Sequence, residues 1–407
     1  MKNIYLYLIV IFLDSCQFSP PIVMITEDII KIDIAKKYPS KDIQFNTFRN
    51  REYVPLETND DVLLDRYAMI VSVSEKYILV KDLIDRSNIY VFDRNGKIIS
   101  LINRRGNGPQ EYTSISDVVF DEKNNEIFVF NNYGADGIGY ILVYSLTGEY
   151  KRKLKYPANF ILKAYNFNDE TILVYDIKNL YNDNYNKKPY MLLSKKDGSI
   201  TFTLNINLPV RYDTKEYIKF TDKTGQLYTT SSNLIIPNKR HFGEDFLIGD
   251  ISSDTIYRLT NKGDLKPFIV RTPSVHSTNP HVACTPAFIS DKFIILHIVA
   301  LDYELLKNDI IPSEKRLMYE FETGEIYSID HWNCPAFTNI LQKNINVSVI
   351  DAAILKQRFK DEMKLNAELI ATFGEEDKKR FEKLEHLIKA HDDEDNPIVM
   401  IDHFNEY

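Results

Sequence analysis

The stretch NIYVFDRNGKIISLI (residues 88–102) decides the fold. It contains two runs in which apolar and polar residues alternate, and the polar segment between them ends in Gly96. Alternation with a period of two is typical of a β-strand with one buried face. Glycine takes the positive φ that a tight hairpin turn needs. The stretch therefore predicts a β-hairpin.

The same pattern returns four times along the chain. The copies are ILVYSLTGEYKRKL (141–154), YMLLSKKDGSITFTL (190–204), TIYRLTNKGDLKPFI (255–269) and LMYEFETGEIYSI (317–329). A second hairpin precedes most of them, at 68–82, 117–131 and 163–176, with a weaker copy at 288–298. The repeating unit is thus four strands over about fifty residues, which is the pattern of a propeller blade.

Five such units are visible, and both ends of the chain supply the sixth. The segment EDIIKIDIAKK (27–37) is strand-like, and NPIVMIDHF (397–405) is a clear strand. We expect the last strand to complete a blade begun near the N-terminus, because this closes the ring and removes its edges. Two helical stretches, 352–373 and 375–390, precede it.

The predicted fold is all-β, a six-bladed β-propeller with a short C-terminal helical insert before the closing strand. The propeller spans residues 27–407, with the insert at 351–390 and the closing strand at 397–405. The chain has 407 residues, of which 12% are aromatic, so it can bury a large core. Its net charge of −8 argues against a nucleic-acid partner.

The N-terminus predicts export. Lys2 precedes ten apolar residues, Ile4–Leu13, too few to span a bilayer as a stable helix, and Ser15 and Cys16 follow. This arrangement is that of a bacterial lipoprotein signal peptide over 1–15, with Cys16 lipidated and 16–26 as a tether, although Asp14 departs from the usual small residue. An ordinary secreted protein and a buried strand are the alternatives.

The glycine-rich loop RRGNGPQEY (104–112) has two interpretations. A phosphate-binding loop needs a helix after it, so that the phosphate meets the helix N-terminus. Here a strand hairpin follows, and no G-K-[ST] ends the glycine run. We therefore expect the loop to carry the chain from one blade to the next, with Gly106 and Gly108 allowing a tight path and Pro109 stiffening it.

Several motifs together resemble a known family. They are VPLET (54–58), FDRNGKIISLI (92–102), RGNGPQEY (105–112), DVVFD (117–121) with IFVF (127–130), SDTIYRL (253–259) and DNPIVMI (395–401). In this order they resemble the six-bladed β-propeller lipoproteins of Bacteroidota, distant relatives of NHL-type propellers. The family loop commonly reads G-x-G-P-G-E-Y, and Gln110 here replaces its third glycine. The resemblance implies a lipid-anchored propeller in the cell envelope and no particular activity.

Four residues of the glycine-rich loop are the candidate site for a ligand or partner: Arg104, Arg105, Glu111 and Tyr112. Inter-blade loops lie on a propeller face near the channel mouth, where ligands often bind. The alternative is structural: Glu111 and Tyr112 hydrogen-bond to the loop itself and the arginines are solvated.

Two stretches, HVACTPAF (281–288) and HWNCPAF (331–337), share a His-x-x-Cys pattern. Cys284 and Cys334 could form a disulfide in an oxidising compartment. With His281 and His331 they could instead bind zinc, or the two cysteines could be buried and unpaired.

We expect a binding or scaffold module for a protein, peptide or glycan, monomeric, and anchored in the outer membrane facing the periplasm. No catalytic residue, cofactor or metal ligand is predicted. The alternative is a metal-dependent hydrolase or lyase with its site at the channel, for which Asp117, Glu170 and His297 could face inward.

Overall fold

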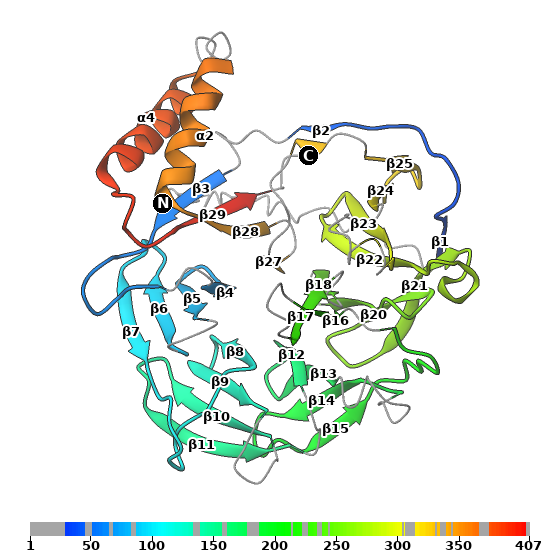
Figure 1. Ribbon diagram of the computed structural model, residues 1–407, viewed down its shortest axis with the longest axis horizontal. Coiled ribbons are helices and arrows are strands. Elements are labelled where there is room, and N and C mark those ends of the chain that lie inside the picture. The colour runs from blue at the N-terminus through cyan, green and yellow to red at the C-terminus, as the bar shows by residue number, and fades with distance from the viewer. Residues whose placement is uncertain are drawn as a thin grey trace, which may run out of the picture.

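The computed structural model describes residues 29–44, 51–64, 68–82, 87–132, 139–156, 161–176, 187–212, 215–221, 227–233, 238–242, 245–302, 305, 314–329, 332–333, 339–342, 345–365 and 374–403. Six β-sheets stand around a central axis, and their first strands lie innermost (Figure 1). The ring is a six-bladed β-propeller, as the sequence predicts.

The blades follow one another along the chain. Blade 1 comprises β4 (Met69–Val73), β5 (Tyr77–Lys81), β6 (Ile89–Asp93) and β7 (Ile98–Ile102). Blade 2 comprises β8 (Asp117–Asp121), β9 (Glu126–Asn131), β10 (Tyr140–Ser145) and β11 (Tyr150–Lys155). Blade 3 comprises β12 (Ile161–Asn166), β13 (Thr171–Asp176), β14 (Tyr190–Ser194) and β15 (Ile200–Thr203).

The second half of the ring has the same plan. Blade 4 comprises β18 (Asn238–Phe242), β19 (Asp245–Gly249), β20 (Thr255–Leu259) and β21 (Leu265–Thr272). A short 3-10 helix, η1 (Val275–Ser277), follows it. Blade 5 comprises β22 (Val282–Ile289), β23 (Phe293–Ala300), β24 (Glu314–Glu320) and β25 (Ile326–Ser328). Blade 6 comprises β27 (Asn339–Gln342), β28 (Ile345–Ile350), β29 (Ile398–His403) and β3 (Arg51–Pro55).

The five predicted hairpin glycines, Gly96, Gly148, Gly198, Gly263 and Gly324, all have positive φ. Gly96 shows a second reason for glycine, because a Cβ there would lie 1.9 Å from the carbonyl oxygen of Pro55. The turn of blade 1 therefore packs directly onto the outer strand of blade 6.

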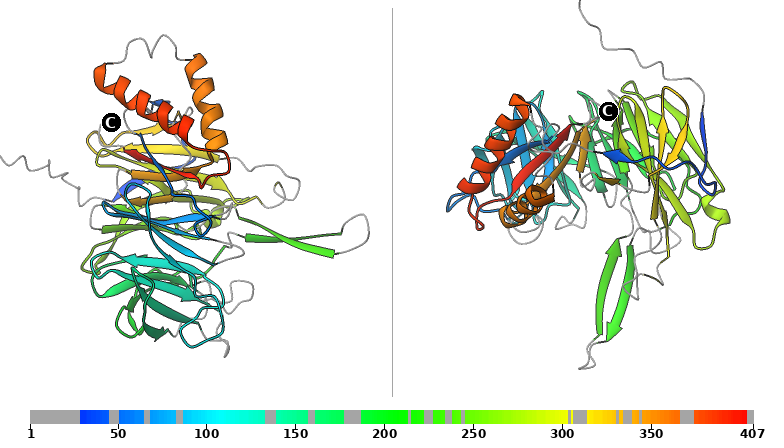
Figure 2. Two further views of the ribbon diagram at one scale, coloured as in Figure 1. Left: turned by 90° about the vertical axis from the view of Figure 1, so that its left-hand side faces the viewer. Right: turned by 90° about the horizontal axis from the view of Figure 1, so that it is seen from above.

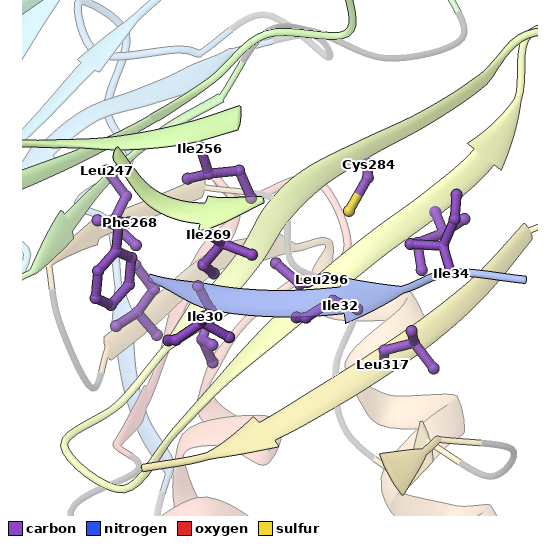
Figure 3. Packing of buried hydrophobic residues seen from close by; sticks show 13 residues of the cluster. Ile30, Ile32, Ile34, Leu247, Ile256, Phe268, Ile269, Cys284, Leu296 and Leu317 are labelled. Atoms are coloured by element: carbon purple, nitrogen blue, oxygen red, sulfur yellow. The ribbon is translucent and has the colours of Figure 1, made fainter. Parts of the chain in front are cut away.

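Both ends of the chain build the closing blade, as predicted. Strand β29 pairs with β28 on one side and with β3 on the other. The prediction that 27–37 provides the N-terminal strand of this blade is wrong, since that strand is Arg51–Pro55. Segment 27–37 instead contains β1 (Ile30–Asp33), which pairs in parallel with β21 at the outer edge of blade 4. Figure 3 shows Ile30 and Ile32 of β1 among apolar residues of blades 4 and 5, which is why the segment pairs there.

The residues after β1 cross the outside of blade 5 on their way to blade 6. Ser40 bridges to Ser328 of β25, and the Lys41 ammonium pairs with Glu320 of β24. Beyond them β2 (Ile43–Gln44) pairs in parallel with β26 (Trp332–Asn333). We call residues 30–44 the N-terminal strap, because they join the outer surfaces of blades 4 and 5 and lead into blade 6.

Apolar clusters fill five junctions between neighbouring blades, from the junction of blades 6 and 1 around to that of blades 4 and 5. Burying each large aliphatic side chain in such a cluster contributes about 1.5–3 kcal/mol. Blade 6 packs Val347, Val399 and Ile401 against blade 1. The opposite face of blade 6 carries the cross-strand row Asn346, Asp402 and Arg51, which points away from blade 1.

The predicted helical insert is present. Helices α2 (Ala352–Leu365) and α4 (Glu375–Ala390) connect β28 to β29 and lie at the rim of the ring (Figure 2). Leu355, Leu384 and Ile388 pack on Ile350, Ile398 and Met400 of blade 6. In the described part of the chain, neither helix is long and apolar enough to cross a membrane.

The ring has two unlike faces. The turns between first and second and between third and fourth strands lie on one face, which we call the turn face. The longer connections lie on the other, the loop face. A hairpin of β16 (Lys215–Thr221) and β17 (Leu227–Asn233), inserted between blades 3 and 4, projects from the ring (Figure 2).

Replacing Asp402 with Ala should destabilise the closing blade. Its carboxylate lies 2.6 Å from Nε of Arg51, both side chains are buried, and Asn346 donates to it as well. Removing one partner of a buried ion pair typically costs about 3–5 kcal/mol, because the other charge stays buried. Urea unfolding followed by circular dichroism measures the loss. Asp169→Ala, which breaks the exposed pair with Lys123, is the control and should leave the midpoint nearly unchanged. Equal effects of the two variants would contradict a role for Asp402 in closure.

Candidate functional site

The glycine-rich loop closes on itself. The N–H of Gly106 donates to the carbonyl oxygen of Tyr112, and the N–H of Tyr112 donates to the carbonyl oxygen of Arg104. Both donor–acceptor distances are 3.0 Å. Oε2 of Glu111 accepts from the N–H of Gly108 at 2.8 Å. After the loop the chain enters β8, a strand, so no helix N-terminus faces the glycines. The loop is an inter-blade turn, as expected.

Tyr112 lies in the core between blades 1 and 2. Its ring packs edge-on against that of Tyr144, and its hydroxyl donates to the carbonyl of Ser87 at 2.7 Å. Burial raises the pKa of Tyr112 to about 12. Tyr112 and Glu111 therefore hold the loop in place, while Arg104 and Arg105 are exposed. A ligand-binding role for these four residues stays a prediction.

Replacing Gly106 with Ala should destabilise the protein, because it breaks the hydrogen bond that Glu111 accepts within the loop. A Cβ at residue 106 would lie 2.0 Å from Oε2 of Glu111, so the carboxylate would have to leave the N–H of Gly108. We expect a loss of about 1–2 kcal/mol, the cost of one charge-assisted hydrogen bond. The same exchange in a Glu111→Ala background should cost clearly less. Thermal unfolding of the four proteins gives the coupling, and strictly additive losses would contradict the contact.

A buried ion pair joins three blades at the loop face. Nζ of Lys81 lies 3.0 Å from Oδ1 of Asp117, and Oδ2 of Asp117 accepts from the N–H of Ala164 at 2.9 Å. Burial alone would raise the pKa of the Asp117 carboxyl, but the cations Lys81 and Lys163 outweigh it and hold the pKa below its usual value. Asp117 therefore links blades 1, 2 and 3.

The structure does not bring the three inward candidates together. Asp117 lies in this ion pair, Glu170 in a turn of blade 3, and His297 on β23, where its Nε2 lies 2.9 Å from Glu314. Among the described residues, no group of three or more His, Cys, Asp and Glu could hold a metal ion.

The side chains of Cys284 and His281 lie in different environments. Cys284 is a buried free thiol on β22 within the cluster of blades 4 and 5, and burial raises its pKa to about 12. His281 stacks on Tyr212 with ring centroids 4.2 Å apart. His331 and Cys334 lie outside the described residues, as does Cys16, so the disulfide, the zinc alternative and the lipidation site remain predictions.

A polar pocket between blades 2 and 3 opens on the turn face. Its volume is about 740 Å³, within the range of small-ligand sites. Its walls come from turns and strand ends of both blades, and its lining residues are Asn124, Glu126, Lys151, Arg152, Asp169, Glu170, Thr171, Ser194, Lys195, Lys196 and Thr201. Four lining residues are cationic and three anionic, so the pocket is slightly positive in a chain whose net charge is −8.

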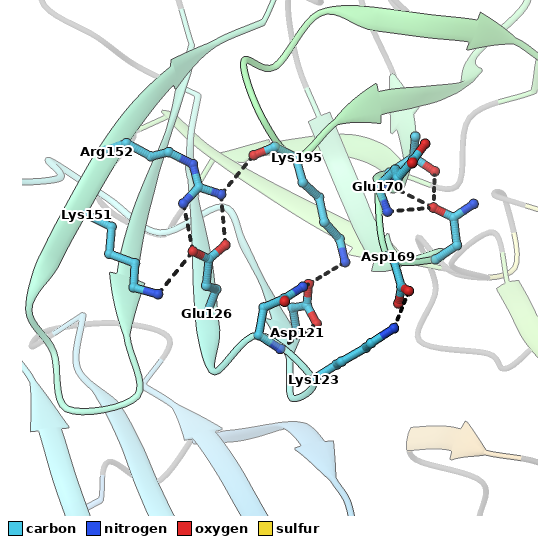
Figure 4. Close-up of polar contacts among 11 residues, drawn as sticks. Asp121, Lys123, Glu126, Lys151, Arg152, Asp169, Glu170 and Lys195 are labelled. Atoms are coloured by element: carbon cyan, nitrogen blue, oxygen red, sulfur yellow. Dashed lines mark hydrogen bonds and ion pairs between the residues drawn. The ribbon is translucent and has the colours of Figure 1, made fainter.

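Ion pairs fix most of these charges (Figure 4). Arg152 holds both oxygens of Glu126, at 2.7 and 2.8 Å, and Lys151 approaches the same carboxylate at 3.1 Å. The hydrogen bond from Arg152 is the largest cause of the lowered pKa of Glu126. Lys195 lies 2.6 Å from Asp121, both buried. These pairs make the pocket wall rigid.

Two charged side chains remain open to a ligand. Lys196 and Glu170 are exposed on adjacent turns, and within the described part of the chain neither forms an ion pair or a side-chain hydrogen bond. The pocket therefore offers one cation and one anion on a rigid polar wall. The sequence analysis missed this site because its residues come from separate segments. The only sequence signal is the basic strand YKRKLK, residues 150–155.

The pH dependence of the free energy of unfolding should reveal the lowered pKa of Asp117. Its folded-state pKa is lowered, so its contribution is complete above the unfolded value, about 3.9, and is lost as the pH falls through the folded-state value. We expect Asp117→Asn to cost about 3 kcal/mol at pH 7 and progressively less as the pH falls below about 3.9. Urea unfolding at pH 7 and at a series of lower pH values measures this, and an equal loss at every pH would show that the carboxylate is not held charged.

Three solved structures are similar to this chain to different degrees. A presumed exported protein of Bacteroides fragilis is 15% identical, covers 92% of this chain and 99% of its own, and has a TM-score of 0.55. The Dos1 propeller is 10% identical, with 67% and 72% covered and a TM-score of 0.33. The β-propeller domain of the Trilobed protease of Pyrococcus furiosus is 9% identical, with 68% and 76% covered and a TM-score of 0.35.

At these identities, the Bacteroides fragilis structure supports the fold alone. No curated protein is similar enough to this chain to count as a relative. Residues 29–402 match the family model described as a domain of unknown function, DUF4934, and because that match spans nearly the whole chain, the protein belongs to this family.

Proposed function

We propose that the protein is a lipid-anchored β-propeller of the cell envelope that acts as a binding or scaffold module for a protein, peptide or glycan. The observation that carries this proposal is the pocket between blades 2 and 3, where a rigid ion-paired wall leaves Lys196 and Glu170 open. A wall that is already held by ion pairs orients a ligand at a lower cost in side-chain entropy on binding. The metal-dependent hydrolase has no comparable support among the described residues.

The location is argued from the N-terminus. The sequence around Cys16 is that of a lipidation site, and the similar Bacteroides fragilis protein is a presumed exported one. The N-terminal strap joins the ring at the outer edge of blade 4, so an anchor at Cys16 would hold the propeller by its rim and leave both faces accessible. We place the anchor in the outer membrane, facing the periplasm, and the protein as a monomer.

A crosslinked pull-down from the native envelope tests the function. The tagged wild type should capture one reproducible partner, identified by mass spectrometry, and Lys196→Ala with Glu170→Ala should reduce the yield about tenfold, the equivalent of about 1.4 kcal/mol. A triple variant with Ala at positions 104, 105 and 111 tests whether the glycine-rich loop contributes to capture of the partner. Lys378→Ala, an exposed lysine on α4, is the control.

The anchor is tested in the same cells. Cys16→Ala should move the protein from the membrane fraction to the soluble fraction, and unchanged fractionation would reject lipidation at Cys16. Capture of no partner by the wild type would contradict the scaffold role and leave small ligands to be tested. Stoichiometric calcium or zinc in the purified protein would favour the hydrolase instead.

A further inference from the structure

The outer edges of the blades differ in how they are protected. An uncovered edge strand can pair with another chain, and proteins usually cover it or place charges along it. Strand β1 covers blade 4, and the N-terminal strap bridges to β25 of blade 5 at Ser40. On blade 2, β11 carries exposed Lys151, Lys153 and Lys155. These three edges are therefore closed to a partner strand.

Within the described residues, the outer edge of blade 3 has none of these protections. There β15 pairs with β14 alone, and all four residues of β15 are exposed. Ile200 is 39% and Phe202 48% exposed, and the strand carries no charge. Its second edge is thus open, uncharged and partly apolar.

The molecule shows how such an edge is used. Strand β1 adds to β21 with Ile30 and Ile32 buried and Lys31 and Asp33 exposed. An extended segment with alternating apolar and charged residues therefore fits the outer edge of a blade in this ring. Main-chain hydrogen bonds supply affinity in such strand addition, and the alternate side chains supply specificity.

The two sides of β15 select different side chains. Thr201 lines the pocket that contains Lys196, on the side of blade 2. Phe202 lies opposite Leu192, which packs in the cluster shared with blade 4. A strand added to β15 would therefore turn one set of side chains towards the positive pocket and the other towards Phe202.

We infer that the edge of β15 binds an extended peptide in which acidic and apolar residues alternate. The peptide adds a fifth strand to blade 3, its acidic side chains lie towards Lys196, and its apolar side chains cover Phe202. This inference rests on the proposed binding function and specifies its ligand as a peptide strand.

Fluorescence polarisation with two synthetic peptides tests the inference. The first is fluorescein-labelled Thr-Glu-Val-Glu-Val-Glu-Thr, and the second has Lys in place of each Glu. The acidic peptide should bind wild-type protein at least about tenfold tighter than the lysine peptide, a difference of about 1.4 kcal/mol. In Lys196→Ala, the affinities of the acidic peptide and the lysine peptide should differ less than they do in wild type. Equal binding of both peptides, or no binding by either, would overturn the inference.

Phe202→Glu removes the apolar contact, places a protective negative charge on the open edge and should abolish binding of the acidic peptide. Ile99→Glu is the matched control, since Ile99 is 42% exposed on β7, the outer strand of blade 1. It should bind like wild type. Thermal unfolding shows whether both variants fold, and Ile200→Glu replaces Phe202→Glu if the latter does not. Loss of binding in the Ile99 variant would overturn the assignment to β15.

Three further outcomes test this inference and distinguish it from the proposed function. If the pull-down captures the same partner with wild type and with Phe202→Glu, the binding function stands and the β15 inference fails. If sedimentation shows a wild-type dimer that Phe202→Glu converts to a monomer, the edge pairs with a second copy, and the peptide assignment is wrong. If the acidic peptide binds but the wild type captures no partner, the edge assignment stands and the scaffold function fails.

Discussion

The pairing of β29 with β3 is the constraint on which the rest of the ring depends. It joins residues 398–402 to residues 51–55, so the two ends of the chain share one sheet. Arg51 and Asp402 bind across this pair while both are buried, which fixes its register as well as its strength. A slip by one residue would turn Val399 and Ile401 away from blade 1 and separate the charges. In the described residues, the four strands of each other blade are close in sequence, so blade 6 is the blade whose own four strands come from both ends of the chain.

The N-terminal strap gives this closure a second support. It pairs with blade 4, contacts blade 5 at Ser328 and Glu320, and then leads into β3. Because these contacts lie on the outside of the ring, any force transmitted through the N-terminus would act first on β1 and the edge of blade 4. The proposed anchor at Cys16 would therefore be separated from the closing strand by two independent attachments.

Most of the fold could be predicted because its signals are local. Each hairpin shows its turn glycine and its alternation within fifteen residues, and the five glycines have the φ values that the turns require. The partner of a terminal strand is a long-range property. Ile30 and Ile32 make 27–37 look like a blade strand, whereas REYVP shows weak alternation and ends in Pro55, so the sequence favoured the wrong segment. The pocket could not be predicted either, since register and blade packing alone bring Glu126, Arg152 and Lys196 together.

The same physics explains where a binding surface can lie on such a ring. Five apolar junctions fix the blades against one another, so the ring presents preformed surfaces to a ligand. The glycine-rich loop is also bound to the core, because Tyr112 is buried and Glu111 holds the backbone. What remains is the surface where the repeat leaves polar groups or strand edges unused. At blade 3 both coincide, since Thr201 of the open strand β15 also lines the charged pocket. A ligand there gains main-chain pairing and charge complementarity at once, without disturbing the closure of the ring.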